Sequence, residues 1–379
     1  MAGASKITTR IDAVLALVRP DILSLRAYAH AEWNPALERL HANESPMRNP
    51  ADVSVTGLNR YPEPQPRALV ERLAMLYDVV PEQLLVGRGS DEAIDLIVRA
   101  FCRAAVDAVV ICPPTFGMYA VAARIQGAAV VEVPLLAARD FALDVDAVLH
   151  AATPRVKVVF LCTPNNPTGT TLAQPDIERV VAALAGRAIV VVDEAYIEFS
   201  KHSSLVQALA DNPHLVILRT LSKFHGLAGA RLGSLLAHSQ LVALLRKIIP
   251  PYAIAQPTVE AALTSLTSES LRIAQERAAL IVSEREALRV ALSGAAGILR
   301  VWPSDANFLL VEFAEPQRVF AAISDAKLLV REARGYGGLS QALRLTIGTC
   351  EQNRRLLAAI TQATAVPRNN LTTSTRAHG

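Results

Sequence analysis

Short apolar runs alternate with amphipathic stretches along the middle of the chain. The amphipathic stretches, such as 118–126 and 176–185, carry apolar residues at helical spacing. The runs between them are rich in Val, Ile and Leu, and they lie at 108–112, 129–133, 156–161, 189–192 and 215–218. Strands that are apolar throughout and separated by helices are typical of a mainly parallel sheet covered on both faces. The pattern therefore predicts a large α/β domain, which we place at residues 51–257.

The C-terminal third of the chain has a different pattern. After a long helical segment at 259–292, strands and helices alternate at 307–313, 316–326, 342–347 and 352–364. This alternation predicts a smaller α+β unit. The N-terminal arm, up to about Pro50, is expected to pack with this unit, because the arm is too short to form its own core. The smaller domain would then combine 1–50 with 258–366, and the polar tail at 367–379 is expected to be loose.

Composition and charge exclude several classes of protein. The chain is 51% hydrophobic and 19% charged, which allows a buried core and is unlike a disordered chain. The net charge is +3 and the basic residues are scattered, so we expect no nucleic-acid partner. Charged residues interrupt any N-terminal signal segment, and no uncharged stretch is long enough to span a membrane. The four cysteines form no CxxC pair, and we expect a reduced, cytoplasmic protein without a metal site.

Candidate chemistry follows the predicted strands. In an α/β sheet the carboxyl ends of the parallel strands meet at one edge, and ligands bind there. Four segments rich in small and polar residues fall at such ends, at 87–92, 164–169, 192–196 and 220–233. We therefore expect a ligand site along this edge of the sheet.

Lys223 and Asp193 carry the strongest chemical signals in these segments. Lys223 follows an apolar strand, and a desolvated lysine there can form an imine with a carbonyl cofactor; the alternative is a solvated surface lysine. Asp193 ends an apolar strand, so its carboxylate favours a cationic partner such as a pyridinium nitrogen. The alternative, a metal or Walker-B carboxylate, requires a GxxxxGK[ST] loop that the chain lacks. Tyr196 could donate a hydrogen bond to a phenolate oxygen on the same ring.

An anion site is expected at the start of a predicted helix over 90–104. The glycine-rich turn that ends at Gly89 would leave backbone amides unpaired at this helix N-terminus, with Ser90 as its N-cap. Alone this is a tight strand–helix turn, but Ser222 and Arg231 add two further partners for a phosphate. Asn166 lies on a proline-bracketed turn, where a plain turn asparagine is the alternative.

Together these residues resemble the fold-type I pyridoxal-phosphate enzymes. Asp193 and Lys223 are thirty residues apart, and the segment from Ser222-Lys223 to Gly229-Ala-Arg-Leu-Gly233 is the most diagnostic part. Four further motifs resemble the histidinol-phosphate aminotransferases, over residues 19–364. They begin at Leu40 (LHANESP), Arg60 (RYPEPQP), Pro114 (PTFGMY) and Asp193 (DEAYIEF).

The resemblance implies a large seven-stranded-type sheet domain and assigns roles to the cofactor site. Lys223 would carry pyridoxal 5'-phosphate as an aldimine and move a proton between the substrate Cα and the cofactor C4′. Asp193 would pair with the ring nitrogen, Asn166 and Tyr196 would hold the phenolate oxygen, and Phe116 would stack on the ring. The residues implied for the cofactor phosphate are Gly89, Ser90, Asp91, Ser222 and Arg231. Tyr61 would reach the phosphate of a neighbouring subunit, which implies a homodimer.

The resemblance also implies a substrate. In such enzymes L-histidinol phosphate and 2-oxoglutarate are converted to imidazole-acetol phosphate and L-glutamate, in L-histidine biosynthesis. Arg344 matches the family's substrate-carboxylate arginine, and with Arg331 it would suit a phosphate dianion. The alternative for Arg331 is a surface ion pair with Glu332 or its neighbours. Tyr28, Asn43 and Asn166 complete the expected substrate contacts.

Other functions share the same cofactor residues. An aromatic amino-acid aminotransferase and a phosphothreonine decarboxylase of this fold differ mainly in the substrate residues, and the expected pair of arginines favours histidinol phosphate. A transcription regulator built on the same domain would need an added DNA-binding module. The residues before Asn43 contain no helix-turn-helix pattern and no basic cluster, which argues against that class.

Overall fold

The computed structural model describes residues 10–29, 34 and 36–365, which form two compact units. The larger unit is Met1–Leu280 with Ser304–Ala306, and the smaller is Ile281–Pro303 with Asn307–Gly379. This division differs from the expected domains, because residues 10–50 belong with the larger unit. Each unit is described separately below.

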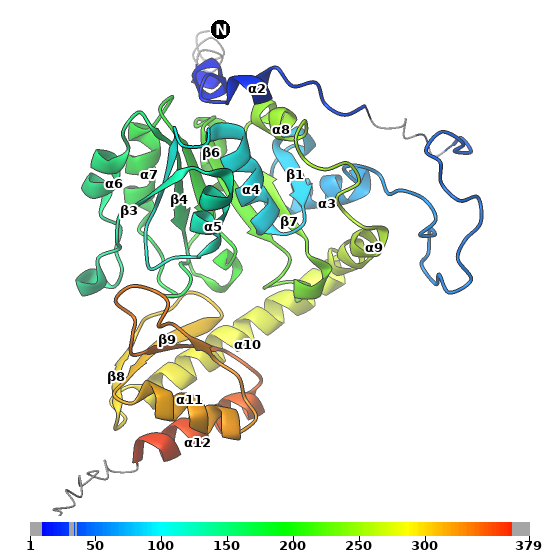
Figure 1. Ribbon diagram of the computed structural model, residues 1–379. Helices are drawn as coiled ribbons and strands as arrows, with labels where there is room; N and C mark the ends of the chain where they lie inside the picture. The colour runs from blue at the N-terminus through cyan, green and yellow to red at the C-terminus, as the bar shows by residue number, and fades with distance from the viewer. Residues whose placement is uncertain (1–9, 30–33, 35, 366–379) are drawn as a thin grey trace, which may run out of the picture. The chain divides into compact units, whose positions relative to one another are not determined.

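The larger unit contains a seven-stranded sheet (Figure 1). Its strands lie in the order β1-β7-β6-β5-β4-β2-β3, and β7 alone runs antiparallel to its neighbours. The bounds are β1 (Leu84–Gly87), β2 (Ala108–Ile111), β3 (Ala129–Glu132), β4 (Val156–Cys162), β5 (Ile189–Asp193), β6 (Leu215–Thr220) and β7 (Gly233–Leu236). The predicted mainly parallel sheet is confirmed, and β1 and β7 are strands that the apolar pattern did not indicate.

Helices cover both faces of this sheet (Figure 1). They are α2 (Pro20–Leu23), α3 (Arg67–Tyr77), α4 (Ser90–Phe101), α5 (Met118–Gln126), α6 (Val145–Ala151), α7 (Gln174–Ala183), α8 (Ser239–Leu245) and α9 (Gln256–Ser265). Short 3-10 turns are η1 (Pro81–Gln83), η2 (Ala137–Arg139), η3 (Ile197–Phe199), η4 (Leu205–Ala210) and η5 (Ala228–Ala230). The long helical segment predicted at 259–292 is two helices, α9 and α10 (Ser268–Leu292), and the boundary between the units falls within α10.

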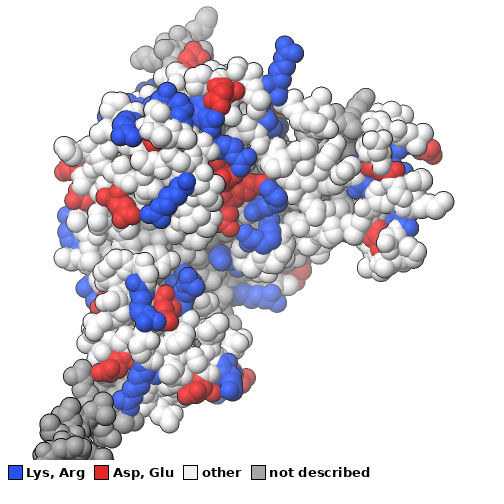
Figure 2. Space-filling view, viewed as in Figure 1, with Lys and Arg blue, Asp and Glu red and all other residues white. Residues whose placement is uncertain are grey.

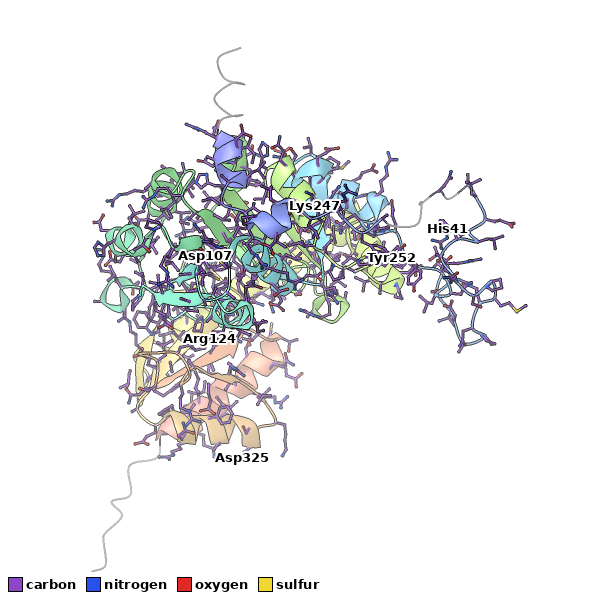
Figure 3. All side chains as sticks on the ribbon, turned by 45° about the horizontal axis from the view of Figure 1, so that its top comes forward. His41, Asp107, Arg124, Lys247, Tyr252 and Asp325 are labelled. Atoms are coloured by element: carbon purple, nitrogen blue, oxygen red, sulfur yellow. The ribbon has the colours of Figure 1, made fainter. Side chains whose placement is uncertain are left out.

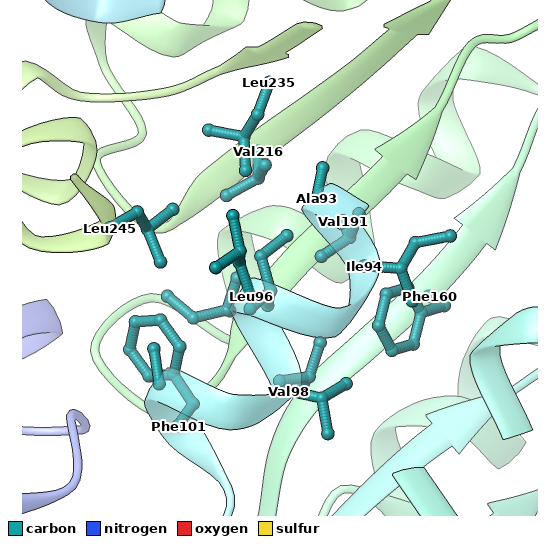
Figure 4. Packing of buried hydrophobic residues seen from close by; sticks show 14 of the residues in the cluster. Ala93, Ile94, Leu96, Val98, Phe101, Phe160, Val191, Val216, Leu235 and Leu245 are labelled. Atoms are coloured by element: carbon teal, nitrogen blue, oxygen red, sulfur yellow. The ribbon is translucent and has the colours of Figure 1, made fainter. Parts of the chain in front are cut away.

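The core of the larger unit lies between α4 and the sheet. Apolar residues at helical spacing on α4, including Ile94 and Phe101, pack against Phe160, Val191 and Val216 of the strands (Figure 4). Burial of each such side chain stabilises the fold by roughly 1.5–3 kcal/mol. This packing fixes the start of α4 relative to the strand ends.

The N-terminal arm was expected to pack with the smaller unit, and this prediction was wrong. Ile11, Val14 and Val18 are buried in the core of the larger unit. The Arg19 amide also donates to the carbonyl of Ala100, at the end of α4. The arm therefore needs no core of its own, because α4 and its neighbours supply one.

The smaller unit is an antiparallel sheet with two helices. Its strands lie in the order β10-β11-β9-β8, with bounds β8 (Ile298–Val301), β9 (Phe308–Phe313), β10 (Arg331–Glu332) and β11 (Ala342–Thr346). Helices α11 (Pro316–Asp325) and α12 (Cys350–Ala365) pack on the sheet through a core that includes Val311, Phe313 and Ile360.

Surface charges are mixed on the face that Figure 2 shows. Lys and Arg side chains there are interspersed with Asp and Glu rather than gathered into one basic field. Within the described residues, no helix combines the length and the apolar character needed to cross a membrane.

Candidate active site

The register of the sheet aligns the chemically active segments. Cys162, at the end of β4, lies opposite Asp193, and Asp193 lies opposite Leu218 of β6. Because β4, β5 and β6 are parallel, the residues that follow them emerge at the same edge. These residues include Asn166 after β4 and Lys223 after β6, as the sequence predicted.

Asp193 is a buried carboxylate with two hydrogen-bond donors. Its Oδ2 accepts from Tyr119 Oη at 2.7 Å, and its Oδ1 accepts from the backbone amide of Ala195 at 3.1 Å. Burial raises the pKa of Asp193 to about 6, although the two hydrogen bonds oppose this rise. No ion pair joins Asp193 to a cation among the described residues. A buried carboxylate of this kind is stabilised by a cationic ligand, so the site fits a protonated ring nitrogen.

A group of three residues lies beside Asp193 and is called the Lys223 group below. Its members are Asn166, Tyr196 and Lys223. Asn166 and Tyr196 are buried, and Asn166 Nδ2 donates to Tyr196 Oη at 3.4 Å. Lys223 Nζ lies 5.9 Å from the centre of the Tyr196 ring. The amine, the phenol and the amide are thus within reach of one small ligand.

Lys223 is exposed in the single chain. The sequence analysis expected a desolvated lysine at the end of a strand, and in this structure the desolvation is absent. The reason is local: Lys223 follows Ser222 in a turn beyond β6 rather than ending the buried strand itself.

The backbone of β7 closely approaches the start of α4. Gly233 of β7 pairs with Gly87 of β1 on one side and with Thr220 of β6 on the other. An added Cβ at Gly233 would lie 2.5 Å from the Gly89 carbonyl carbon and 2.6 Å from the Ser90 nitrogen. Only glycine at position 233 lets the strand approach the start of α4 so closely.

The start of α4 differs in detail from the prediction. Ser90 was expected as the N-cap, but Gly89 is the N-cap and Ser90 is the first helical residue. Gly89 has φ +81°, a left-handed conformation that glycine adopts without strain. The backbone amides of Ser90 and Asp91 therefore lie in the first turn of the helix, where anions bind.

Arg231 lies over this helix start. Its Nη2 would be 2.9 Å from a Cβ at Gly89, and it donates to Asp91 Oδ2 at 3.0 Å. The Ser222 amide donates to Thr220 Oγ1, which holds the turn that carries the Ser222 hydroxyl. Gly89, Ser90, Asp91 and Arg231 thus lie together at the start of α4, and Ser222 follows β6, which pairs with β7.

Phe116 is half-buried and meets Tyr119 edge-on, with ring centres 5.6 Å apart. Its loop is tied to the Asn166 turn by Asn165, which accepts from Thr115 Oγ1 at 2.9 Å and donates to the Pro114 carbonyl at 2.8 Å. Sequence analysis missed both Asn165 and Tyr119. The pairing of Asn165 with Asn166 between two prolines was the available signal for the first, whereas Tyr119 only continues the apolar face of a helix.

A buried ion network supports the segment after Asp193. Arg219 of β6 donates to Glu198 Oε1 at 2.7 Å and to Glu194 Oε2 at 3.4 Å, and its guanidinium lies 4.6 Å from the centre of the Tyr77 ring. Glu194 also accepts from the Leu205 amide at 2.7 Å. These contacts hold the turn between Asp193 and Tyr196, and the sequence analysis did not predict them.

Tyr61 and Asn43 lie in a separate pocket of about 590 Å³. Tyr61 stacks on Tyr252, which Figure 3 labels, with ring centres 4.6 Å apart, and its amide donates to Glu44 Oε1 at 2.6 Å. None of the residues of the Lys223 group lines this pocket. Within the single chain, the structure does not bring Tyr61 to the predicted cofactor site, and it does not bring Asn43, an expected substrate contact, to the Lys223 group.

Tyr28 is also separate from the Lys223 group. It is mostly exposed and lines a pocket of about 270 Å³ together with Arg246 and Lys247, the latter labelled in Figure 3. No residue of the Lys223 group lines this pocket, so the expected substrate contact of Tyr28 is not made within one chain.

Arg331 and Arg344 are paired in the smaller unit. Arg331 of β10 lies directly opposite Arg344 of β11. Directly opposed residues on antiparallel strands have Cβ atoms about 4.5–5.5 Å apart, and like charges at this spacing are destabilising without an anion. The alternative for Arg331 is an ion pair with Glu332 or its neighbours; among the described residues Glu332 pairs with Arg334 instead, and no ion pair of Arg331 is found.

The described residues contain no group of three or more His, Cys, Asp or Glu side chains that could hold a metal ion.

Comparison with known proteins agrees with this geometry. The model of the family "Aminotransferase class I and II" matches residues 41–360. A histidinol-phosphate aminotransferase of Stenotrophomonas maltophilia is 50% identical over 355 residues, which cover 92% of this chain and 97% of that protein. One of Xylella fastidiosa is 49% identical and covers 95% of this chain and 99% of its own length. The structure of the Sinorhizobium meliloti histidinol-phosphate aminotransferase in complex with pyridoxal-5'-phosphate is 25% identical, with a TM-score of 0.71 over 81% of this chain and 83% of that chain. The chain therefore belongs to the aminotransferase class I and II family.

Proposed function

We propose that this aminotransferase converts L-histidinol phosphate and 2-oxoglutarate into imidazole-acetol phosphate and L-glutamate, a step of L-histidine biosynthesis. The substrate assignment is carried by one observation, the cross-strand pair of Arg331 and Arg344. The names of relatives that share about half of their residues with the chain support the same substrate.

Pyridoxal phosphate is proposed to attach covalently to Lys223. When bound, the cofactor supplies an electron sink for the negative charge that develops on the substrate α-carbon. Asp193 favours the protonated ring nitrogen, because a cation beside it offsets the burial of its carboxylate. Tyr196 and Asn166, which already share a hydrogen bond, hold the ring oxygen, and Phe116 stacks on the ring face.

The cofactor phosphate is proposed to bind at the start of α4. The amides of Ser90 and Asp91 donate to it, the turn at Gly89 admits it, and Ser222 and Arg231 complete its partners. Arg231 pairs with Asp91 in this structure, so the phosphate competes with that exposed carboxylate for the guanidinium. A dianion attracts a guanidinium more strongly than one exposed carboxylate does, and bidentate Arg–phosphate bonds are among the strongest in proteins.

The reaction needs one group that moves a proton. Lys223 Nζ is a primary amine that lies beside the Tyr196 ring. We propose that this amine would hold and move the proton of the substrate α-carbon while the cofactor is bound. Tyr196 positions this amine, and Asp193 keeps the ring nitrogen charged while the proton moves.

The substrate phosphate ester is proposed to bind between Arg331 and Arg344. Two opposed guanidinium groups neutralise a dianion, whereas a monoanionic carboxylate would leave one of the two positive charges without a counterion. The side chain of Arg344 lies 5.3 Å from the centre of the Phe308 ring, which limits its freedom. Tyr28 and Asn43 remain proposed as substrate contacts, and both would have to come from a second copy of the chain.

A homodimer is proposed as the functional unit. The segment 37–61 carries large apolar side chains on its surface, and these include Leu37, Leu40, Met47, Val53 and Val55. Val53 is 97% exposed and Leu40 is 90% exposed. An exposed group of this kind marks a protein interface, and a second copy would cover it. Tyr61 would then reach the phosphate at the neighbour's α4, which fits its absence from the Lys223 group of its own chain.

A half-reaction tests the proposed substrate. Cofactor-loaded protein is mixed separately with L-histidinol phosphate, phenylalanine and phosphothreonine, while the absorbance of the bound cofactor is followed. Rapid loss of the starting band with L-histidinol phosphate alone is expected. A faster change with phenylalanine would assign the chain to the aromatic aminotransferases, and release of carbon dioxide from phosphothreonine would make it a decarboxylase.

A further inference from the structure

Tyr119 is a fully buried polar side chain near the site. It lies in the first turn of α5 with no exposed surface. Its ring stacks on Phe160 of β4, with centres 4.7 Å apart and planes at 7°. A ring held in this way has one direction for its hydroxyl, and that direction leads to Asp193 Oδ2 at 2.7 Å.

The same ring also touches Phe116. The two rings meet edge-on, at 84° and 5.6 Å between centres. Phe116 and Tyr119 flank the start of one helix, and Asn165 ties the loop before it to the Asn166 turn. Tyr119 is therefore in contact with two residues on which the proposed cofactor ring depends, one for its face and one for its nitrogen.

We propose that Tyr119 is a positioning residue for the cofactor ring. Its hydroxyl orients the Asp193 carboxylate and holds it in the ionised form, and its ring edge supports Phe116. Tyr119 touches neither cofactor nor substrate and acts through these two side chains. The proposal rests on the proposed function, because it requires pyridoxal phosphate to bind beside Asp193.

The physical basis is the location of one proton. That proton can lie on the ring nitrogen, which leaves Asp193 charged, or on Asp193, which leaves the ring neutral. A donated hydrogen bond stabilises the charged carboxylate, so Tyr119 favours the protonated ring. Asp91 opposes this effect, Lys223 assists it, and the neighbouring Cys162 is a neutral thiol because burial raises its pKa. Without the hydroxyl, the Ala195 amide would be the one hydrogen-bond donor left to the carboxylate among the described residues.

The test compares two variants, each of which replaces one tyrosine with phenylalanine and so removes one hydroxyl group. Tyr119→Phe removes the hydroxyl and keeps both ring contacts. Tyr77→Phe is the matched control, since the Tyr77 hydroxyl is buried but has no hydrogen-bond partner among the described residues. Each cofactor-free protein is titrated with pyridoxal phosphate and, separately, with an analogue in which a CH group replaces the ring nitrogen, and the dissociation constants are measured.

We expect the dissociation constant to change for one variant only, and for one of the two compounds only. Tyr119→Phe should weaken pyridoxal phosphate about tenfold, the scale of one hydrogen bond to a charged group. It should leave the affinity for the analogue unchanged, because the analogue presents no cation to Asp193. Tyr77→Phe should bind both compounds as the wild type does. The ratio of the two affinities is measured within one protein, so a partly unfolded sample does not change it.

Two results would overturn the positioning role. One is wild-type affinity for pyridoxal phosphate in Tyr119→Phe, and the other is an equal loss for both compounds, which would make the hydroxyl purely structural. A third measurement tests whether Tyr119 acts through Asp193. In an Asp193→Asn background, Tyr119→Phe should cause no further loss of affinity for pyridoxal phosphate. If the wild-type chain itself fails to bind pyridoxal phosphate, the proposed function is wrong, and this outcome is separate from the two above.

Discussion

Arg331 and Arg344 face each other across the ladder between β10 and β11. Neither the fold nor the packing of the smaller unit requires two like charges at this position, since its core is formed by apolar residues, including Leu343 and Leu345 of β11. Arg331 is exposed at the edge of the sheet and forms no ion pair with the neighbouring Glu332. An anionic ligand explains the pair better than the structure of the unit does.

Arg331→Gln should therefore raise the KM for L-histidinol phosphate by about 10- to 100-fold, which corresponds to the loss of one or two bonds between charged groups. The kcat should change little, because the phosphate is remote from the bond that reacts. Arg355→Gln on α12 removes the same charge from the smaller unit and should behave as the wild type. Steady-state kinetics of the three proteins decide the question, and an unchanged KM in Arg331→Gln would remove the phosphate from this site.

Asp193 should make the stability of the cofactor-free chain depend on pH. Burial raises its pKa from 3.8 to about 6 in the folded state, so the folded chain binds more protons than the unfolded chain between these values. The contribution of Asp193 to the free energy of unfolding should then fall as pH rises from about 4 to about 6, by up to about 3 kcal/mol, and stay level above that range. Asp193→Asn carries no charge at any pH. Urea unfolding should show this variant equal to the wild type at pH 4 and more stable at pH 7, and the opposite order would contradict the assigned pKa.

The sequence predicted the parts of the fold that depend on apolar periodicity. The strands that end at Cys162, Asp193 and Thr220 are buried on both faces, so their apolar runs were unambiguous. β1 ends at Gly87, β7 begins with Gly233 and Ser234, and β10 has two residues, so none of these strands stands out as an apolar run. The N-terminal arm was assigned to the wrong unit, because apolar periodicity shows which face of a segment is buried but not which core that face joins.

The candidate site was predictable where chemistry stands next to a strand end. Lys223, Asp193 and Arg231 are charged residues in otherwise apolar or glycine-rich segments, and each stood out for that reason. Tyr119 did not, because its ring belongs to the buried face of α5 and only the folded structure reveals what its hydroxyl meets. Tyr61 illustrates the opposite limit: its role was implied by resemblance, and a single chain cannot bring it to the site.

Gly233→Ala should damage the cofactor site through the backbone. The added methyl group would overlap the backbone of Gly89 and Ser90, and neither atom belongs to a flexible side chain that could move aside. Overpacking of this kind costs about 1–3 kcal/mol, and the start of α4 would shift from β7. We expect a lower melting temperature and weaker binding of pyridoxal phosphate. Gly229→Ala, whose methyl group would meet no atom within 4 Å, should change neither quantity.

Tyr61 should act on the neighbouring subunit rather than on its own. Lys223→Ala and Tyr61→Ala proteins are each expected to be nearly inactive when assayed at limiting cofactor. If Tyr61 serves the partner's site, a mixed dimer has one site that combines an intact Lys223 with an intact Tyr61 from the other chain. Random exchange makes half of the dimers mixed and gives each mixed dimer one working site of two, so activity should recover to about a quarter of the wild-type value. If Tyr61 serves its own chain, every site in the mixture lacks one of the two residues, and mixing would restore no activity.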